Sequence, residues 1–66
     1  MAKVGDEFIL HSSNGMDYDI EVINVNEFRE PSMKYGIDMY DCNGTYAGDV
    51  IFVGEDFLCK CEKVNN

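Results

Sequence analysis

The stretch YGIDMYDCNGTYAGDVIFV, residues 35–53, has the clearest local pattern in this chain of 66 residues. Apolar and polar residues alternate on both sides of Asn43-Gly44, as is typical of strands that bury one face. Asn-Gly favours a two-residue hairpin turn, because both residues tolerate positive φ values. The stretch therefore predicts an antiparallel hairpin with its turn at residues 43–44.

A two-residue turn fixes the residues that lie opposite each other, namely Ile37 and Val50, Asp38 and Asp49, Tyr40 and Ala47, and Cys42 and Thr45. The predicted core face is apolar and consists of Tyr35, Ile37, Met39, Val50 and Phe52. The opposite face is mixed and consists of Asp38, Tyr40, Cys42, Asp49, Ile51 and Val53. If Asp38 and Asp49 lie opposite each other, they would bind a cation, one of them would have a raised pKa, or they would bind a lysine of a partner. A bulge at Gly48 would instead separate them.

Two further alternating runs precede the hairpin. The first, DEFILHS (residues 6–12), predicts a strand with Phe8 and Leu10 on the core face and ends in a turn at SSNG, residues 12–15, whose Asn14 and Gly15 supply positive φ. The second, MDYDIEVINVNEF (residues 16–28), predicts a long strand whose core face consists of Met16, Tyr18, Ile20 and Val22. Its apolar parity shifts at Val22-Ile23, which predicts a β-bulge or a sharp bend.

The rest of the chain predicts connections and one last strand. Residues 27–34 are the one long loop, with room for a short helical turn at its proline. GEDF (residues 54–57) predicts a tight or 3₁₀ turn, and LCKCEKV (residues 58–64) a final short strand. The whole chain is predicted to be a single all-β domain, residues 1–66, with an ordered core over 3–64 and frayed residues 65–66. We expect a five-stranded antiparallel sheet that is strongly bent or closed into a barrel.

This order of strands resembles the Src-homology-3-like small barrels, the group that includes Tudor and KOW modules. The resemblance rests on VGDEFIL as first strand, DYDIEVINV as long bent second strand, the hairpin KYGIDMYD and GDVIFV, and GEDFLCKC as turn and final strand. It covers nearly the whole chain but is a pattern of strands and turns without a sequence motif. Because this fold class includes peptide binders, RNA binders and structural modules, the resemblance implies little about function.

The charge of the chain excludes several classes of function. Thirteen acidic residues against five basic ones give a net charge of −8, and the basic residues form no cluster in the sequence. Direct binding of nucleic acid or of an anionic membrane requires clustered lysine and arginine, so neither is expected. The start of the chain lacks the pattern of a secretory signal, and no segment is apolar for the length of a membrane span. An odd number of cysteines does not fit a secreted disulfide framework, so we expect a reducing, cytoplasmic location.

The cysteines and the histidine predict no chemistry of their own. On a strand, Cys59 and Cys61 would lie on the same side with Cα atoms nearly 7 Å apart, too far for an unstrained disulfide. Structural zinc needs four converging ligands, and Cys42 and His11 would have to come from other strands. We therefore expect core thiols, a surface role for His11, no metal or cofactor, and no enzymatic activity, since no nucleophile motif or phosphate loop is present.

Binding residues are predicted on two kinds of surface. Asp17, Asp19 and Glu21 form a row of carboxylates about 6.7 Å apart along one strand face, similar in kind to phosphates along a nucleic-acid strand. The predicted acidic binding residues are Asp17, Asp19, Glu21, Asp38 and Asp49. The predicted apolar binding residues are the aromatic side chains of Phe28, Tyr40 and Tyr46, a type favoured at protein interfaces.

Two functions fit these surfaces. The first is a non-enzymatic protein that blocks a basic surface of a host nucleic-acid-binding protein; in size and charge the chain resembles the small acidic inhibitors of phages and mobile elements. The second is a small β-barrel adaptor or structural module that binds a peptide or a subunit, with acidity serving only solubility. In the first case the partner is a protein with a basic surface. Both functions are compatible with a homodimer.

Overall fold

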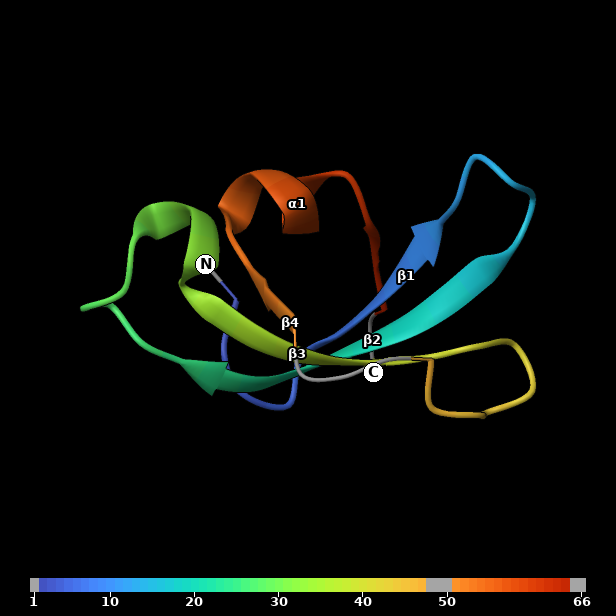
Figure 1. Cartoon of the computed structure of the whole chain (residues 1–66), viewed down its shortest axis with the longest axis horizontal. Helices are drawn as coiled ribbons and strands as arrows, with labels where there is room; N and C mark the ends of the chain where they lie inside the picture. The colour runs from blue at the N-terminus through green and yellow to red at the C-terminus, as the bar shows by residue number, and fades with distance from the viewer. Residues whose placement is uncertain (1, 48–50, 65–66) are drawn as a thin grey trace.

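A computed structural model describes residues 2–47 and 51–64 and shows one bent antiparallel sheet (Figure 1). Its five strands have the order β4-β3-β2-β1-β5. The strands are β1 (Glu7–His11), β2 (Asp17–Val25), β3 (Tyr35–Tyr40), β4 (Ile51–Val53) and β5 (Glu62–Lys63). A 3₁₀ helix, η1 (Pro31–Met33), and a short α-helix, α1 (Glu55–Cys59), complete the described structure. The predicted five-stranded, strongly bent sheet is confirmed, and it is not closed into a barrel, because β4 and β5 remain at its two edges.

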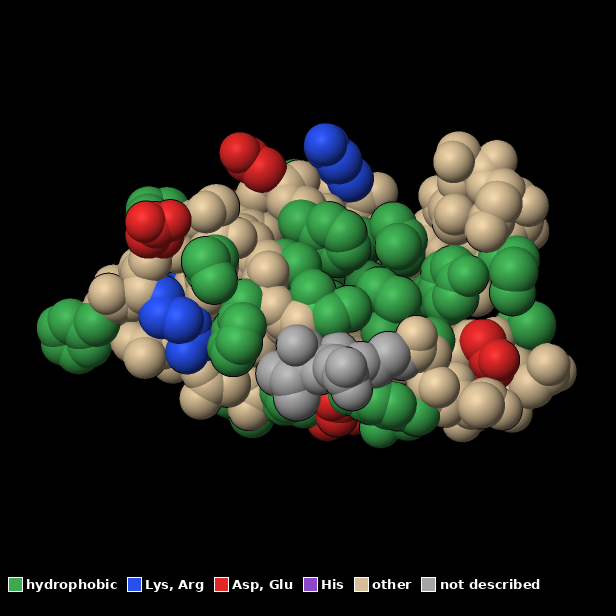
Figure 2. All heavy atoms as spheres, in the orientation of Figure 1, with side chains coloured by type: hydrophobic (Ala, Val, Ile, Leu, Met, Phe, Trp, Pro, Cys, Tyr) green, Lys and Arg blue, Asp and Glu red, His purple; other side chains and the backbone are tan. Residues whose placement is uncertain are grey.

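One face of the sheet carries the core. Its buried apolar residues are Ala2, Phe8, Ile20, Val22, Tyr35, Ile37, Val53 and Leu58. Phe8 lies opposite Ile20, and Val22 opposite Ile37, so neighbouring strands present these side chains to the same side. The helix α1 covers this face with Leu58, and Figure 2 shows hydrophobic side chains gathered between α1 and the strands. The core face predicted for the first two strands is therefore confirmed at Phe8, Leu10, Ile20 and Val22, whereas Met16 is exposed and Tyr18 does not belong to the core.

The predicted β-bulge is present in β2. The pairing of β2 with β3 shifts between Val22 and Asn24, so that Val22 lies opposite Ile37 and Val25 opposite Tyr35. The extra residue brings Val25 back to the core side, where it packs against the buried cluster.

The two predicted turns lie where they were expected, but their conformation differs. In each, the glycine amide donates to a carbonyl three residues earlier, Gly15 to Ser12 at 3.1 Å and Gly44 to Asp41 at 3.0 Å. Within each turn only the glycine has a positive φ, 85° at Gly15 and 80° at Gly44. Asp or Ser at the first position and Gly at the fourth is the preference of a type I turn, so the asparagine before each glycine needs no positive φ. Asp41 stabilises its turn further, because its Oδ1 accepts hydrogen bonds from the amides of Asn43 and Thr45.

The pairing of the hairpin differs from the prediction in opposite directions near the turn and at β4. Tyr40 is bridged to Tyr46 instead of Ala47, and Ile37 lies opposite Ile51 instead of Val50. The predicted pairs of Tyr40 with Ala47 and of Ile37 with Val50 are therefore wrong. The pair of Cys42 with Thr45 is also wrong, because the carbonyl of Thr45 accepts from the amide of Asp41 at 2.9 Å. An odd shift in register exchanges the two faces of a strand. Consequently Val53 is buried, Ile51 packs against the core, and Phe52 points outward and is 42% exposed. The predicted Asp38–Asp49 pair, the bulge at Gly48 and the frayed residues 65–66 lie outside the described residues.

The loop before β3 agrees with its prediction, whereas the end of the chain does not. Residues 27–34 contain one short 3₁₀ helix, η1, as expected. Residues 55–59, in contrast, form the helix α1, and only Glu62 and Lys63 of the predicted final strand pair with β1. Two acidic residues in the first turn of α1 favour the helix, and Leu58 anchors it in the core. A helix this short has too few turns to show its period in the sequence.

Candidate partner-binding face

The sheet face opposite the core carries six carboxylates, which we call the acidic face. They are Glu7, Asp17, Asp19, Glu21, Asp38 and Glu62. Glu7 lies opposite Glu21 on the neighbouring strand, and Glu21 lies opposite Asp38 on the next. These three residues form a row across β1, β2 and β3, whose strands are about 4.8 Å apart. The acidic face therefore holds carboxylates both along a strand and across three strands.

Four of these carboxylates have no cationic partner within the described residues. No lysine, arginine or histidine nitrogen of residues 2–47 and 51–64 lies within 4.0 Å of Glu7, Asp19, Glu21 or Asp38. Like charges directly opposite each other destabilise a sheet by up to about 1 kcal/mol. Folding alone gives no reason to keep such a row, so the row is the feature of this molecule that most needs a functional explanation.

Basic side chains near the sheet are engaged away from the acidic face. Lys63 forms an ion pair with Asp6 at 3.0 Å and lies over the ring of Phe8 on the core side. Lys34 lies 3.7 Å from Glu27. In Figure 2 the viewed face is hydrophobic in its middle, and acidic side chains appear only at its margins. Lys34 and Lys63 are thus paired with carboxylates that do not belong to the acidic face.

The acidic face is hollowed and partly apolar. A shallow hollow of about 380 Å³ is lined by Glu7, Ile9, Asp19, Ile20, Glu21, Tyr40, Gly44 and Val64. Tyr40 packs edge to face against Tyr46, with ring centroids 5.6 Å apart. Lysine and arginine combine a charged head with an apolar stem, so a surface with carboxylates beside Ile9 and Tyr40 suits both parts of such a side chain.

His11 is the one histidine of the chain, and it lies on the acidic face. Its Nδ1 is 2.9 Å from Oδ1 of Asp17, and its Nε2 is 2.9 Å from Oε1 of Glu62. The hydrogen bonds to Glu62 and to Asp17 raise the pKa of His11 above its ordinary value of 6.5. The predicted surface role of His11 thus becomes a specific one, a link between β1, β2 and β5.

The link should make stability depend on pH in a defined direction. Because the pKa of His11 is higher in the folded state, its contribution to stability is complete below about pH 6.5 and is lost as the pH rises through the folded value. Urea denaturation at several values between about pH 6 and pH 9 should therefore show the wild type and His11→Gln converging as the pH rises. A difference in the free energy of unfolding that is the same at every pH would contradict this expectation.

The structure brings together most, but not all, of the predicted binding residues. Asp17, Asp19, Glu21 and Asp38 lie on the acidic face. Tyr40 lines its hollow, and Tyr46 packs against Tyr40. Asp49 lies outside the described residues. Phe28 does not belong to this cluster, because it lies in the loop between β2 and η1. Sequence reasoning missed Glu7 and Glu62 as members of the site, although alternation did place both away from the core.

Phe28 is held out into solvent by an ordered loop, which projects at one end of the molecule (Figure 1). Its side chain is 101% exposed. Arg29 organises the loop: Nε donates to the carbonyl of Met33 at 2.7 Å, and Nη2 donates to Asn24 Oδ1 at 2.7 Å and to the carbonyl of Lys34 at 3.1 Å. The guanidinium also lies 4.5 Å from the centroid of the Phe52 ring.

Since the fully exposed ring of Phe28 packs against none of residues 2–47 and 51–64, its removal should not affect folding. We expect Phe28→Ser to change the free energy of unfolding by less than about 0.5 kcal/mol. The matched control, Phe8→Ala, removes a buried ring and should cost about 3–5 kcal/mol. Urea denaturation measures both variants. A loss above about 1 kcal/mol for Phe28→Ser would show that the ring packs against the fold.

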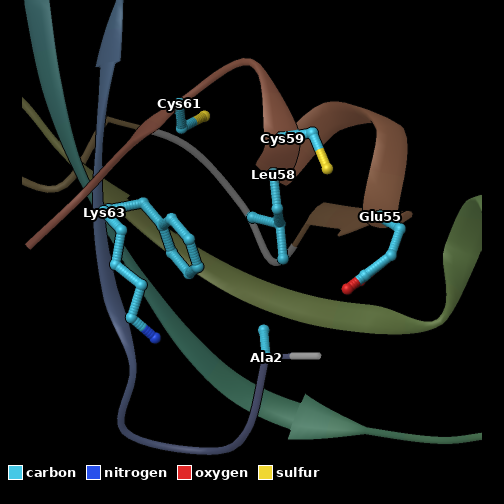
Figure 3. Close-up of a pocket in the computed structure, with 7 residues that line it drawn as sticks. Ala2, Glu55, Leu58, Cys59, Cys61 and Lys63 are labelled. Atoms are coloured by element: carbon cyan, nitrogen blue, oxygen red, sulfur yellow. The ribbon is translucent and has the colours of Figure 1, made fainter.

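A second hollow lies between α1, β1 and the first residues (Figure 3). Ala2, Phe8 and Leu58 form its apolar part, and Glu55, Cys59, Cys61 and Lys63 line its rim. The prediction that both of these cysteines are core thiols is wrong for Cys59, which is exposed because residue 59 is helical instead of extended. Cys61 is half-buried, and burial raises the pKa of its thiol.

The structure and the comparisons with known proteins add three findings. Among residues 2–47 and 51–64, no group of three or more His, Cys, Asp or Glu side chains is arranged to hold a metal ion. In the same part of the chain, no helix has the length and apolar character needed to cross a membrane. No model of a known protein family matches the chain, and no curated protein or solved structure shows significant similarity to it. The resemblance to Src-homology-3-like barrels therefore stays a prediction.

Proposed function

We propose that this chain is a non-enzymatic protein-binding domain whose acidic face occupies a basic surface of a partner protein. The observation that carries the proposal is the row of Glu7, Glu21 and Asp38 across three strands, which lacks cationic partners among the described residues. A partner that supplies lysine or arginine would relieve the repulsion within the row. Two effects therefore favour binding to such a partner, namely the new ion pairs and the reduced repulsion among the carboxylates of the row.

The partner we propose is a nucleic-acid-binding protein, and the chain acts as its inhibitor in the manner of phage anti-defence proteins. A basic groove that binds phosphates does so with arginine forks and lysine ammonium groups, which bind carboxylates in the same way. Carboxylates about 6.7 Å apart along β2 and about 4.8 Å apart between strands supply a two-dimensional array of such acceptors. The free thiols of Cys42, Cys59 and Cys61 support our proposal that the protein works in a reducing compartment such as the cytoplasm.

Phe28 is the second contact that we propose. Aromatic side chains often contribute a large share of the binding free energy in protein interfaces. A loop that is already ordered loses little conformational entropy on binding. Arg29 orders the loop, so that Phe28 is presented without a large entropic cost. We expect an apolar pocket on the partner to receive this ring, at some distance from the basic surface that meets the acidic face.

The proposal is tested by capturing the partner from the native cell with the purified protein, at about 50 mM and about 500 mM salt. We expect capture to weaken steeply at high salt, because exposed charges are screened within a Debye length of a few ångströms there. We also expect an excess of nucleic acid to displace the partner, because both ligands use the same groove. A partner that stays bound at high salt and binds nucleic acid at the same time would contradict the proposal.

The second candidate is an adaptor that binds an extended peptide or a subunit at an edge of the sheet. The observation in its favour is that the sheet is open, with β4 and β5 at its edges. In this case the acidity serves only solubility, and binding is carried by backbone hydrogen bonds and apolar contacts. Salt-insensitive capture would favour this function over the first.

A further inference from the structure

The arrangement around His11 requires a charged ring. Both ring nitrogens lie 2.9 Å from a carboxylate oxygen, one of Asp17 on β2 and one of Glu62 on β5. A neutral imidazole has one N–H donor and one nitrogen lone pair, so it can donate to only one carboxylate. The other nitrogen would then point its lone pair at an anion. When both carboxylates are ionised, two hydrogen bonds of this kind exist together only if His11 is an imidazolium.

This imidazolium is a cation built into an otherwise acidic surface. The ionisable groups that face it are Asp17 on β2 and Glu62 on β5; Asp19 lies farther along β2, opposite Ile9, and Glu7 lies at the other end of β1. Among residues 2–47 and 51–64, no lysine or arginine lies within 4.0 Å of any of these four carboxylates. The ring therefore occupies the place between two carboxylates that the charged head of a partner's lysine or arginine would otherwise take.

We propose that the proton on His11 gates the acidic face, keeping Asp17 and Glu62 occupied when present and releasing one of them to a basic partner when it leaves. The inference rests on the proposed function and specifies how that site is regulated. Loss of the proton makes the face more negative by one charge and removes one hydrogen bond. Binding of a basic ligand therefore tightens as the pH rises through the transition of His11.

The carboxylates of Glu62 and Asp17 raise the pKa of His11 above its ordinary value of 6.5, toward the pH at which most cellular proteins work. The gate also works without unfolding the edge of the sheet. β5 stays attached by the amide of Val64, which donates to the carbonyl of Glu7 at 3.0 Å, and by the ion pair of Lys63 with Asp6.

The test uses a hexaarginine peptide as the basic ligand, titrated at low salt between about pH 6 and pH 8.5, above the ordinary range of aspartate and glutamate. We expect its affinity for the wild type to increase about two- to fivefold over this interval, the size expected for one exposed charge pair. His11→Gln should bind at every pH about as tightly as the wild type does at the highest pH. The matched control, Lys60→Gln, removes one positive charge from the end of α1 and should keep the pH profile of the wild type.

Two further measurements keep the gate separate from a structural effect of the substitution. The pKa of His11, followed by nuclear magnetic resonance of the ring protons, should fall in Glu62→Gln, and the binding profile of that variant should move to lower pH by the same amount. Circular dichroism establishes that both variants are folded. If His11→Gln keeps the pH profile of the wild type, the gate is wrong while the acidic face stands.

The failure of the proposed function has a different signature. The variant Asp19→Asn, Glu21→Gln, Asp38→Asn neutralises the centre of the acidic face and leaves His11 and its two carboxylates in place. If it binds hexaarginine as the wild type does, or if the wild type does not bind the peptide at any pH, the acidic face is not a binding site and the gate fails with it.

Discussion

Replacing Asp19, Glu21 and Asp38 with lysine is expected to weaken binding to the partner at least about a hundredfold. The three residues lie on adjacent strands at the centre of the acidic face, and the change places three cations where the partner presents its own. Like charges brought together in an interface cost several kcal/mol, and a hundredfold loss corresponds to about 2.7 kcal/mol. Titration calorimetry with the captured and purified partner measures the effect.

The same variant should remain folded. The three side chains project from the face opposite the core. A lysine at position 21 would face Glu7, where the wild type has two carboxylates, while positions 21 and 38 would remain a pair of like charges. We therefore expect a free energy of unfolding within about 1 kcal/mol of the wild type or above it. Retention of binding to within about threefold in a folded variant would contradict a role for the acidic face.

A large effect on folding is also expected for Gly54→Ala, at the junction of β4 and α1. A Cβ atom on Gly54 would lie 2.5 Å from the carbonyl oxygen of Pro31 and 2.8 Å from Cα of Ser32. Both are backbone atoms of η1, so relief requires α1 or η1 to move. Such overpacking typically costs about 1–3 kcal/mol, a large part of the stability of a domain of this size.

Gly36→Ala is the matched control, because neither glycine has a positive φ and both changes reduce the entropy of the unfolded chain equally. The Cβ of residue 36 would meet only side-chain atoms, the nearest being Cβ of Asn24 at 3.2 Å. In urea denaturation, Gly54→Ala should therefore have a much lower free energy of unfolding than Gly36→Ala. Equal stability of the two variants would show that η1 and the start of α1 are not packed together.

Much of the sheet is predictable from alternation, since the pattern is set by residues that are close in the sequence. Phe8, Ile20 and Ile37 are assigned to the core correctly, and the parity shift after Val22 locates the bulge. The register of the hairpin is not predictable from Asn43-Gly44 alone. The side chain of Asp41 accepts hydrogen bonds within the turn and favours a type I turn, in which Tyr40 pairs with Tyr46. The pairing of Ile37 with Ile51 is shifted in the opposite direction, and no residue of the turn indicates it.

The candidate site is predictable only in part, for a related reason. Asp17, Asp19 and Glu21 share a face because they alternate along one strand. Glu62 joins them only because β5 pairs with β1. That pairing depends on where the end of α1 places the residues that follow it, which is a matter of tertiary packing. The contact between His11 and Glu62 spans 51 residues, and no local pattern indicates it.

The most direct test of a binding role for the acidic face compares two variants of equal net charge. Asp19→Asn, Glu21→Gln, Asp38→Asn removes three charges from the face, and Glu27→Gln, Glu30→Gln, Asp56→Asn removes three exposed charges elsewhere, so both carry −5 instead of −8. The measurement is the dissociation constant for the captured partner as a function of salt concentration. We predict that the first variant binds weakly and with a shallow salt dependence, while the second keeps the affinity and steep salt dependence of the wild type. Equal losses in both variants would mean that net charge alone matters, and would contradict a binding site on this face.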